Sequence, residues 1–189
     1  MIHHCNNVQG SDPDDYSLVQ PVILTRKTHA LTFELDLNGY PINPFEETNQ
    51  IGRGILPYYG PNQVVVLVIT KYCSPTHVNF VVVDNTPGVL PGDLLEHGET
   101  VKQVIEREYF DIFHVEIKDM PRSPYIVHCE YIYGDKRNTN WSWIEYNYVH
   151  IHISEELEPS TEYKWKTGFR LKSNLQKSVL DFIRYYHHC

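Results

Sequence analysis

The chain has 189 residues, of which 41% are hydrophobic, 13% aromatic and 21% charged, which excludes a disordered chain and allows one domain with a sizeable core. Its formal net charge of -8 excludes a broad basic surface for the phosphates of a nucleic acid. Small anionic ligands are compatible with this charge, because a few local cations or a bound metal ion can offset the overall field.

The cysteines and the N-terminus indicate a cellular compartment. Cys5, Cys73, Cys129 and Cys189 have neither CxxC spacing nor a zinc pattern, so we expect reduced thiols in a reducing compartment. No apolar run approaches the ~20 residues of a membrane-spanning helix, and the N-terminus lacks the features of a signal or transit peptide. The sequence therefore predicts a soluble, cytoplasmic protein with no membrane in this chain, and it does not specify an oligomeric state.

The first third of the chain combines short strands with polar segments. Residues 1–17 are polar and are predicted to form a flexible leader. Strands are predicted at 18–25 and 31–37, and the second ends at an Asn-Gly pair, residues 38–39, which is a strong tight-turn signal. Residues 40–62 are rich in Gly, Pro and Asn and are predicted to form a long loop.

The middle of the chain carries the clearest periodic patterns. Two near-continuous apolar runs, 64–72 and 78–84, are typical of strands that are covered on both faces. After a further loop, apolar residues at three- and four-residue spacing predict a helix from Glu99 to Phe113.

The last third returns to strands and closes with a helix. Strands are predicted at 125–133, 143–153 and 163–165. Ser173, with Gln176 three residues later, matches a capping box and predicts the start of a C-terminal helix. Together these elements predict an α/β fold, with a mixed β-sheet sandwiched between helices.

Glu108 is the one residue of the predicted helix that its apolar pattern does not explain. It lies one turn after Val104 and one turn before Ile112, and residues four apart share a helix face. Burying a lone carboxylate is costly unless a cation pairs with it. An arginine or a functional metal ion would meet that need, and Asp111 flanks the same face. The spacing alone leaves both partners open.

The segment around Glu108 has the spacing of a known motif. Glu99 and the pair Arg107-Glu108 are separated by seven residues, a bulky apolar residue follows, and Asp111 adds a carboxylate. The segment resembles the Nudix box, G-x5-E-x7-R-E-U-x-E-E, in which U is bulky and apolar. Asp93 stands where the box has its glycine.

The resemblance extends well beyond the box. The further motifs, in chain order, are NGYPINPF (38–45), GRG (52–54), GPN (60–62), ITKY (69–72), LPG (90–92), RNT (137–139) and WIE (143–145). Together they resemble the mitochondrial ADP-ribose pyrophosphatases and the related cytosolic domain of the ADP-ribose-gated melastatin-type cation channels. The resemblance therefore identifies residues 18–189 as a Nudix-like domain.

This resemblance implies a Nudix fold and a reaction. The reaction is the Mg²⁺-dependent hydrolysis of ADP-ribose, or of a related nucleoside diphosphate, to AMP and ribose 5-phosphate, with Mn²⁺ as an alternative metal. Magnesium prefers a few carboxylates together with waters and substrate oxygens. The resemblance implies metal ligands at Glu108 and Asp111. It also implies catalytic roles for Glu99, as an outer ligand or water-orienting group, and for Arg107, which would hold a carboxylate in place. A mitochondrial location is the family's alternative to the cytoplasm.

Five further residues are implied to bind the substrate, some with a plainer alternative. Arg53 lies between two glycines, which let backbone N–H groups approach an anion. Arg137 lies in a polar turn, where contact with a phosphate and simple solvation are both open. Trp143 would stack on an adenine or belong to the core. Asn62 and Glu145 follow from the motifs GPN and WIE.

Several positions depart from the family pattern. Ile112 replaces the second of the paired glutamates, and loss of such a carboxylate is expected to cost at least ~10–100-fold in metal affinity or activity. Asp93 replaces a glycine where a tight turn is expected. Glu46 and Glu47 stand in place of an arginine-containing run, and Asn-Trp (140–141) stands in place of Asp-Asn.

Three functions follow from this mixture of retained and altered positions. The retained carboxylates of the box favour a working but slow ADP-ribose pyrophosphatase. Ile112 favours a sensor that binds ADP-ribose without hydrolysing it. The acids at 46–47 favour a scaffold that has lost both activities.

Overall fold

A computed structural model describes residues 28, 30, 32–74, 77–86, 89–117, 126–153 and 156–167. The predicted leader 1–17, the predicted strand 18–25 and the helix predicted to begin near Ser173 lie outside these residues. No helix in the described ranges is both long and apolar enough to cross a membrane.

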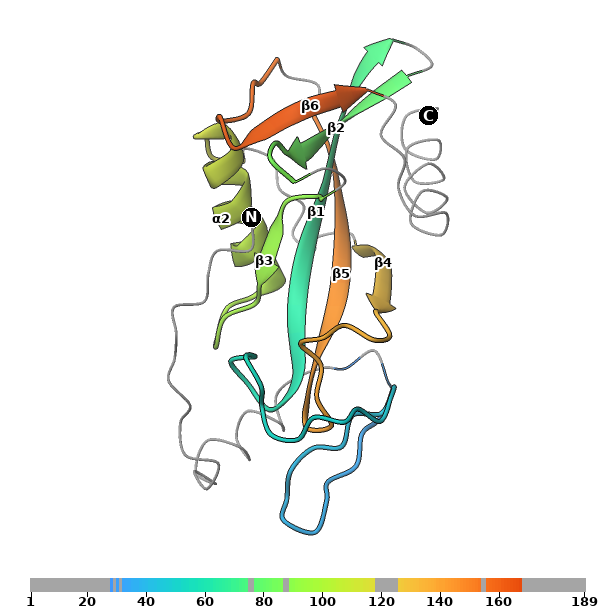
Figure 1. The fold of residues 1–189 in the computed structure, drawn as a ribbon. Coiled ribbons are helices and arrows are strands. Elements are labelled where there is room, and N and C mark those ends of the chain that lie inside the picture. The colour runs from blue at the N-terminus through green and yellow to red at the C-terminus, as the bar shows by residue number, and fades with distance from the viewer. Residues whose placement is uncertain are drawn as a thin grey trace. The chain divides into compact units, whose positions relative to one another are not determined.

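Six strands and one helix make up the described fold. In chain order they are β1 (Gly60–Ser74), β2 (His77–Val83), β3 (Gly92–Leu94), α2 (Val101–Phe113), β4 (Ile126–Tyr131), β5 (Ser142–His152) and β6 (Tyr163–Thr167). The strands form one six-stranded sheet in the order β4-β5-β1-β2-β6, with β3 paired to β1 (Figure 1). The pairs β1–β2 and β2–β6 are antiparallel. The predicted α/β class with a mixed sheet is confirmed.

The chain divides into two compact units. The unit that contains α2, here called the helix unit, includes the described residues of 65–128 and 147–167. The other, here called the loop unit, includes the described residues of 28–64 and 129–146.

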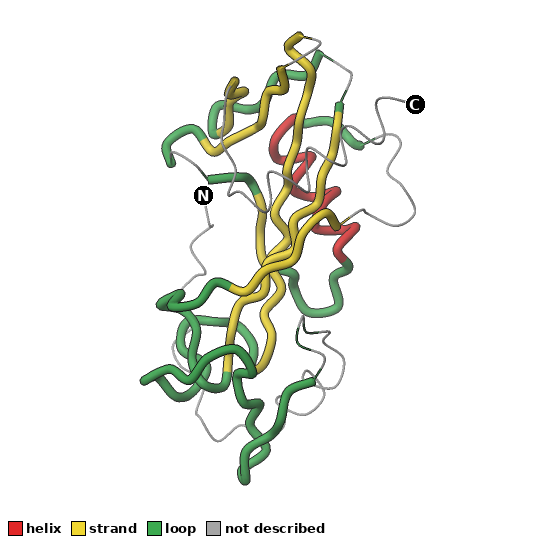
Figure 2. The backbone as a smooth tube through the Cα atoms, turned by 90° about the vertical axis from the view of Figure 1, so that its right-hand side faces the viewer, coloured by secondary structure: helices red, strands yellow, loops and turns green. Residues whose placement is uncertain are grey.

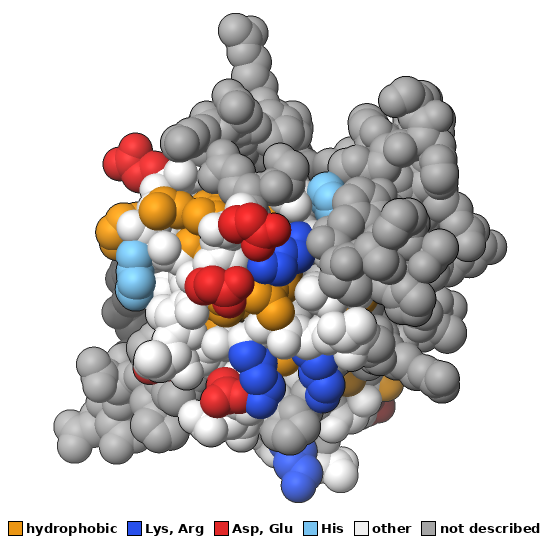
Figure 3. Space-filling view, turned by 90° about the horizontal axis from the view of Figure 1, so that it is seen from above, with side chains coloured by type: hydrophobic (Ala, Val, Ile, Leu, Met, Phe, Trp, Pro, Cys, Tyr) orange, Lys and Arg blue, Asp and Glu red, His pale blue; other side chains and the backbone are white. Residues whose placement is uncertain are grey.

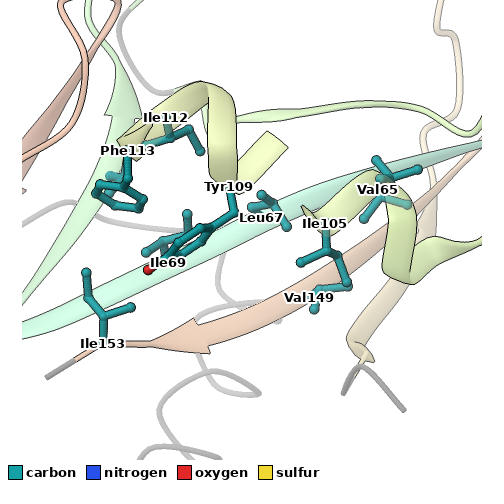
Figure 4. Packing of buried hydrophobic residues seen from close by; sticks show 11 residues of the cluster. Val65, Leu67, Ile69, Ile105, Tyr109, Ile112, Phe113, Val149 and Ile153 are labelled. Carbon is teal, nitrogen blue, oxygen red and sulfur yellow. The ribbon is translucent and has the colours of Figure 1, made fainter. Parts of the chain in front are cut away.

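The core of the helix unit is built from α2 and the strands beside it. Val65, Leu67 and Ile69 alternate along β1 and are fully buried, as expected for residues that share one face of a strand. Figure 4 shows Tyr109 beside Ile69 in the same apolar cluster. In Figure 2, α2 is the red segment that runs along the yellow strands of this unit.

Both ends of α2 have identifiable caps. Thr100 accepts a hydrogen bond from the backbone N–H of Gln103, and the side chain of Gln103 accepts one from the backbone N–H of Thr100, which is a capping box. At the other end His114 adopts the left-handed conformation, with φ 55°, and its N–H bonds to the carbonyl of Phe110. The predicted helix 99–113 is therefore confirmed within two residues.

Strand β3 was predicted to be part of a loop, and this prediction is wrong. Proline and glycine flank the segment, yet its backbone joins the sheet: the carbonyl of Pro91 accepts the N–H of Leu67 at 2.8 Å. Gly92 makes the approach close enough, because a Cβ at that position would lie 2.3 Å from the carbonyl oxygen of Val65. The proline and glycine content of the segment predicted a loop. The segment forms a strand because glycine has no Cβ, which lets its backbone approach β1.

The prediction of a strand at 31–37 is also wrong for residues 32–37, which are the part of it that the structure describes. Only an isolated bridge joins Leu35 to Pro41, around the predicted turn at 38–39, where Gly39 has φ 86°. Pro41 has no N–H to extend the ladder, and Asp36 instead caps the turn through its carboxylate. The strands predicted at 64–72, 78–84, 125–133, 143–153 and 163–165 are confirmed as β1, β2, β4, β5 and β6.

Candidate functional site

Three carboxylates of the helix unit converge on the guanidinium of Arg107. Its Nη1 lies 2.9 Å from Oδ2 of Asp93 and 3.0 Å from Oε1 of Glu108. Its Nε and Nη2 lie 3.3 Å and 3.4 Å from the two oxygens of Glu99. We call Asp93, Glu99, Arg107 and Glu108 the Arg107 cluster.

Neighbouring segments of the chain position this cluster. Asp93 lies in β3, Glu99 lies just before α2, and Arg107 and Glu108 lie in the middle of α2. The carboxylate of Asp93 also accepts the N–H of Leu94 at 2.7 Å, and that of Glu99 accepts the N–H of residue 96 at 3.0 Å. Backbone hydrogen bonds therefore orient both carboxylates that approach Arg107 from outside the helix.

Glu108 is the buried member of the cluster, with only 6% of the residue exposed. Burial raises the pKa of Glu108 to about 7, and the charges of Asp93 and Asp111 raise it too, against the lowering by Arg107. Burial also disfavours the charged form of Arg107, but its hydrogen bonds to Glu99 and Asp93 raise its pKa above the usual range. The prediction that Glu108 is buried is confirmed, and Arg107 is the arginine partner that the spacing left open beside a metal ion. One guanidinium does not balance all the surrounding carboxylates.

Asp93 does not have the strained turn conformation expected for a residue in the place of a glycine. Among the described residues, His114 is the one non-glycine with positive φ, so the backbone of Asp93 is ordinary. The demanding position belongs to Gly92 instead. The expectation that Asp93 weakens the turn is wrong. Its side chain adds a carboxylate to the Arg107 cluster, which sequence reasoning missed.

The residues present suit magnesium in their chemistry. Within the described ranges, no group of three or more His, Cys, Asp or Glu side chains is arranged to hold a metal ion. Magnesium does not require such a cage, because one or two carboxylates with waters and substrate phosphates suffice. Glu108 and the exposed Asp111, one turn further along α2, supply two hard oxygen donors. Ile112, by contrast, is fully buried in the apolar cluster.

In the loop unit, three of the residues implied to bind substrate are fully buried and bonded within the protein. The amide of Asn62 donates to the carbonyls of Tyr58 and Gly60 and to Ser142, and it accepts the N–H of Tyr58. Trp143 packs edge-on against Phe33, with ring centroids 5.5 Å apart. These contacts hold the loop before β1 against the start of β5, and they favour the core alternative for Trp143.

Glu145 is a buried carboxylate that accepts hydrogen bonds from three neutral side chains of the described chain. Its Oε1 accepts the indole N–H of Trp143 at 2.7 Å and the hydroxyl of Thr28 at 2.5 Å. Its Oε2 accepts the side-chain amide of Gln63 at 3.0 Å. Because none of its surface is exposed, the carboxylate of Glu145 contacts other residues of the chain and not solvent in this structure.

The two arginines implied to bind substrate lie in the loop unit and have partners there. Arg53 donates to the carbonyl of Pro57 at 3.0 Å. Arg137 donates through Nε and Nη2 to the two oxygens of Asp135, at 3.0 Å and 2.6 Å, and also to the hydroxyl of Tyr146. Burial works against the ionised form of Asp135, yet the hydrogen bonds from Arg137 hold its pKa below the usual value. Arg137 is thus fixed rather than simply solvated, with its side chain 26% exposed.

The positions that depart from the family pattern in the loop unit stabilise its turns. Glu46 accepts hydrogen bonds from Tyr131 and from the backbone of Gly134. The side chain of Asn140 accepts two hydrogen bonds from Thr48, and Trp141 stacks on Tyr40 with ring centroids 4.3 Å apart.

Figure 3 shows charged side chains of both signs on one face of the molecule. Acidic and basic side chains stand next to one another there, with hydrophobic side chains between them.

Comparisons with known proteins bear on the family. No family profile matches the chain. The cation channel "Transient receptor potential cation channel subfamily M member 2" of Rattus norvegicus is 32% identical over 156 residues, which cover 73% of this chain and 10% of the channel. A protein of Caenorhabditis elegans provisionally named nudix hydrolase 6 is 27% identical over 126 residues, 62% of this chain and 48% of that protein.

Two further relatives carry ADP-ribose in their names. The mitochondrial ADP-ribose pyrophosphatase of Rattus norvegicus is 25% identical over 158 residues, 67% of this chain and 45% of that protein. Among solved structures, the nudix domain of NrtR from Shewanella oneidensis, in complex with ADP ribose, is similar with a TM-score of 0.41 and 16% identity, over 68% of this chain and 88% of that one. The chain spans about half the length of the two hydrolases and about a tenth of the channel. The resemblance to Nudix hydrolases is confirmed.

Proposed function

Because this chain is similar to Nudix hydrolases and to an ADP-ribose pyrophosphatase, we propose that it hydrolyses ADP-ribose, or a related nucleoside diphosphate, slowly and with Mg²⁺ or Mn²⁺. The products are AMP and ribose 5-phosphate. The observation that carries this proposal is the state of Glu108, a buried carboxylate whose pKa is raised to about 7 even though Arg107 contacts it. Such a group calls for more positive charge than one guanidinium provides.

Each residue of the Arg107 cluster has a role in this proposal. Glu108 and Asp111 would hold the metal, which, when bound, neutralises pyrophosphate oxygens and polarises the phosphorus. Arg107 fixes the carboxylates of Glu99 and Glu108 relative to each other through three different nitrogens. Glu99, which is only partly buried, would orient a water or act as an outer ligand.

The experiment that tests this function compares three purified proteins. Wild type, Glu108→Gln and Glu106→Gln are incubated with ADP-ribose and Mg²⁺ or Mn²⁺, and AMP is quantified. Glu106 is an exposed neighbour on α2 that pairs with Lys102 and so serves as the matched control. We expect AMP release from wild type and from Glu106→Gln, and a loss of at least ~100-fold in Glu108→Gln. Absence of AMP release by wild type would reject a hydrolase, and equal AMP release by wild type and Glu108→Gln would reject the role of Glu108.

A second function, binding of ADP-ribose without hydrolysis, is favoured by the burial of Ile112. The side chain at this position belongs to the apolar core, where the family pattern has a carboxylate. Calorimetric titration of the same proteins separates the two functions. Binding of ADP-ribose by wild type with no release of AMP would identify a sensor. Absence of binding at high ligand concentration would reject both functions and favour a scaffold that has lost both activities.

A further inference from the structure

The carboxylate of Glu46 accepts hydrogen bonds from a group of donors in the loop unit. Its Oε1 accepts the hydroxyl of Tyr131 at 2.6 Å, and the backbone N–H of Gly134 lies 3.2 Å and 3.1 Å from its two oxygens. The side-chain amide of Asn138 lies 3.5 Å from Oε1, and its closer acceptors are the hydroxyl of Tyr131 at 2.9 Å and the carbonyl of Ile132 at 3.4 Å. All three donors lie more than 80 residues from Glu46 in the chain, at the last residue of β4 and in the segment that follows it.

The hydroxyl of Tyr131 is oriented to donate. It accepts two amide hydrogen bonds, from Asn43 at 3.2 Å and from Asn138 at 2.9 Å. A phenol oxygen has one proton to give, and these two amides use its acceptor positions, so the proton points to Glu46. The ring is held as well, because it stacks on Phe45 with centroids 4.3 Å apart.

The rest of the donor set is held by contacts that do not involve Glu46. Asn138 is 2% exposed, and its side-chain oxygen accepts the N–H of Ile144 at 2.9 Å. Gly134 adopts φ 72°, a left-handed conformation that suits glycine. The donors are therefore arranged in advance for whatever oxyanion lies between them.

The site is open to solvent on one side. Gly134 is exposed, and no atom lies within 4 Å of the place where its Cβ would stand. Glu46 itself is only partly buried, on a loop of the chain that also carries the exposed Glu47. An external anion can therefore reach the N–H of Gly134 once the carboxylate of Glu46 moves aside.

We propose that Tyr131, Gly134 and Asn138 form an oxyanion-binding site, and that Glu46 is its resident occupant, which an external phosphate or carboxylate group displaces. The site is separate from the Arg107 cluster and does not depend on hydrolysis of ADP-ribose. A tethered carboxylate competes at an effective concentration in the millimolar range or above, so its removal strengthens binding of a free anion. Glu46 thereby lowers the affinity of the site until a ligand with sufficient binding energy arrives.

The test uses Glu46→Ala and the neighbouring Glu47→Ala in the full chain. Both variants remove one negative charge from the same loop, but only Glu46→Ala empties the donor set. The backbone amide of Gly134 is followed by NMR while inorganic phosphate or acetate is added, with chloride at matched ionic strength as the reference. We expect Glu46→Ala to bind phosphate or acetate at least about tenfold more tightly than wild type. Glu47→Ala should remain within about twofold of wild type, because it changes only the screened surface charge.

The two anions identify which oxyanion the site prefers, and a response to either one supports the proposal. A Gly134 amide that does not respond to phosphate or acetate in folded Glu46→Ala would overturn it, as would an equal gain in Glu47→Ala. If Glu46→Ala is unfolded, its refolding on addition of each anion is followed by circular dichroism. Refolding by phosphate or acetate but not by chloride supports the site, and continued unfolding in both anions rejects it.

Discussion

Glu108 in the helix unit and Glu145 in the loop unit are both buried carboxylates, but their surroundings differ in kind. Among its described contacts, Glu145 receives an indole N–H, a hydroxyl and an amide from neutral side chains. Glu108 touches a guanidinium and lies in the field of other carboxylates, which together with burial raise its pKa to about 7. A buried carboxylate with several hydrogen bonds fixes a structure, whereas one in excess negative charge favours a further cation.

The largest expected effect comes from placing a carboxylate inside the core of the helix unit. Ile112→Glu puts a charge where the native side chain is fully buried, which should lower the free energy of unfolding by roughly 4 kcal/mol or more. If position 112 reaches the metal site of Glu108 and Asp111, Mg²⁺ should restore part of this loss. Thermal unfolding of wild type, Ile112→Glu and the neutral control Ile112→Gln, with and without Mg²⁺, measures both effects. An equal gain from Mg²⁺ in Ile112→Glu and Ile112→Gln would show that a carboxylate at position 112 does not reach the metal.

Removing the structural carboxylate should be nearly as damaging. Glu145→Ala leaves the buried indole N–H of Trp143 and the donors of Thr28 and Gln63 without this acceptor, which we expect to cost about 3 kcal/mol. Glu145→Gln keeps one acceptor oxygen and should lose less. Urea unfolding of both variants, beside the exposed-site control Glu34→Ala, gives the free energies. A Glu145→Gln protein of unchanged stability that no longer binds ADP-ribose would return Glu145 to the substrate-binding role implied by its motif.

The pH dependence of stability should report the charge environment of Glu108. The folded pKa of Glu108, about 7, is higher than its ordinary value of 4.5, so the folded state binds the proton more tightly. Stability from this group is therefore present at low pH and is lost as pH rises from about 4.5 to about 7. The loss is on the order of 2–3 kcal/mol and is absent in Glu108→Gln.

Unfolding in urea at pH 5 and pH 8, in a chelating buffer, measures this difference. Between the two values, Glu108→Gln should gain stability relative to wild type, while Glu106→Gln should follow wild type. Divalent metal added at pH 8 should stabilise wild type and Glu106→Gln but not Glu108→Gln if Glu108 holds it. A wild type and Glu108→Gln with parallel pH profiles would mean that Arg107 fully neutralises Glu108.

The features that could be predicted from the sequence are those set by residues close together in the chain. The helix and its buried Glu108 follow from local periodicity, and five strands follow from apolar runs. Strand β3 does not, because its pairing depends on the close approach of Gly92 to Val65, which no local pattern encodes. The role of Asp93 was missed for the same reason, since its partner Arg107 is 14 residues away.

The loop unit was the harder region to predict from sequence. Its motifs were visible, but their partners lie 80 to 92 residues apart, as in the contacts of Asn62 with Ser142 and of Glu46 with Asn138. Without those partners, a polar residue in a motif suggests a ligand contact. In the folded chain the same side chains connect distant loops by hydrogen bonds. The resemblance to the family therefore located these residues, but it did not predict their contacts within the chain.

The smallest expected effect concerns the end of the helix that carries the Arg107 cluster. His114 holds φ 55° at the C-cap of α2, where a residue with a Cβ is strained and glycine is not. His114→Gly should therefore raise the free energy of unfolding by about 1 kcal/mol, and His114→Ala should not. Thermal unfolding of the two variants measures the difference. Because this cap lies six residues beyond Glu108 and outside the cluster, the pH dependence of stability assigned to Glu108 should be retained in His114→Gly. A change in that dependence would mean that the helix end and the carboxylates are coupled, and that the charge demand of Glu108 is set partly by how α2 terminates.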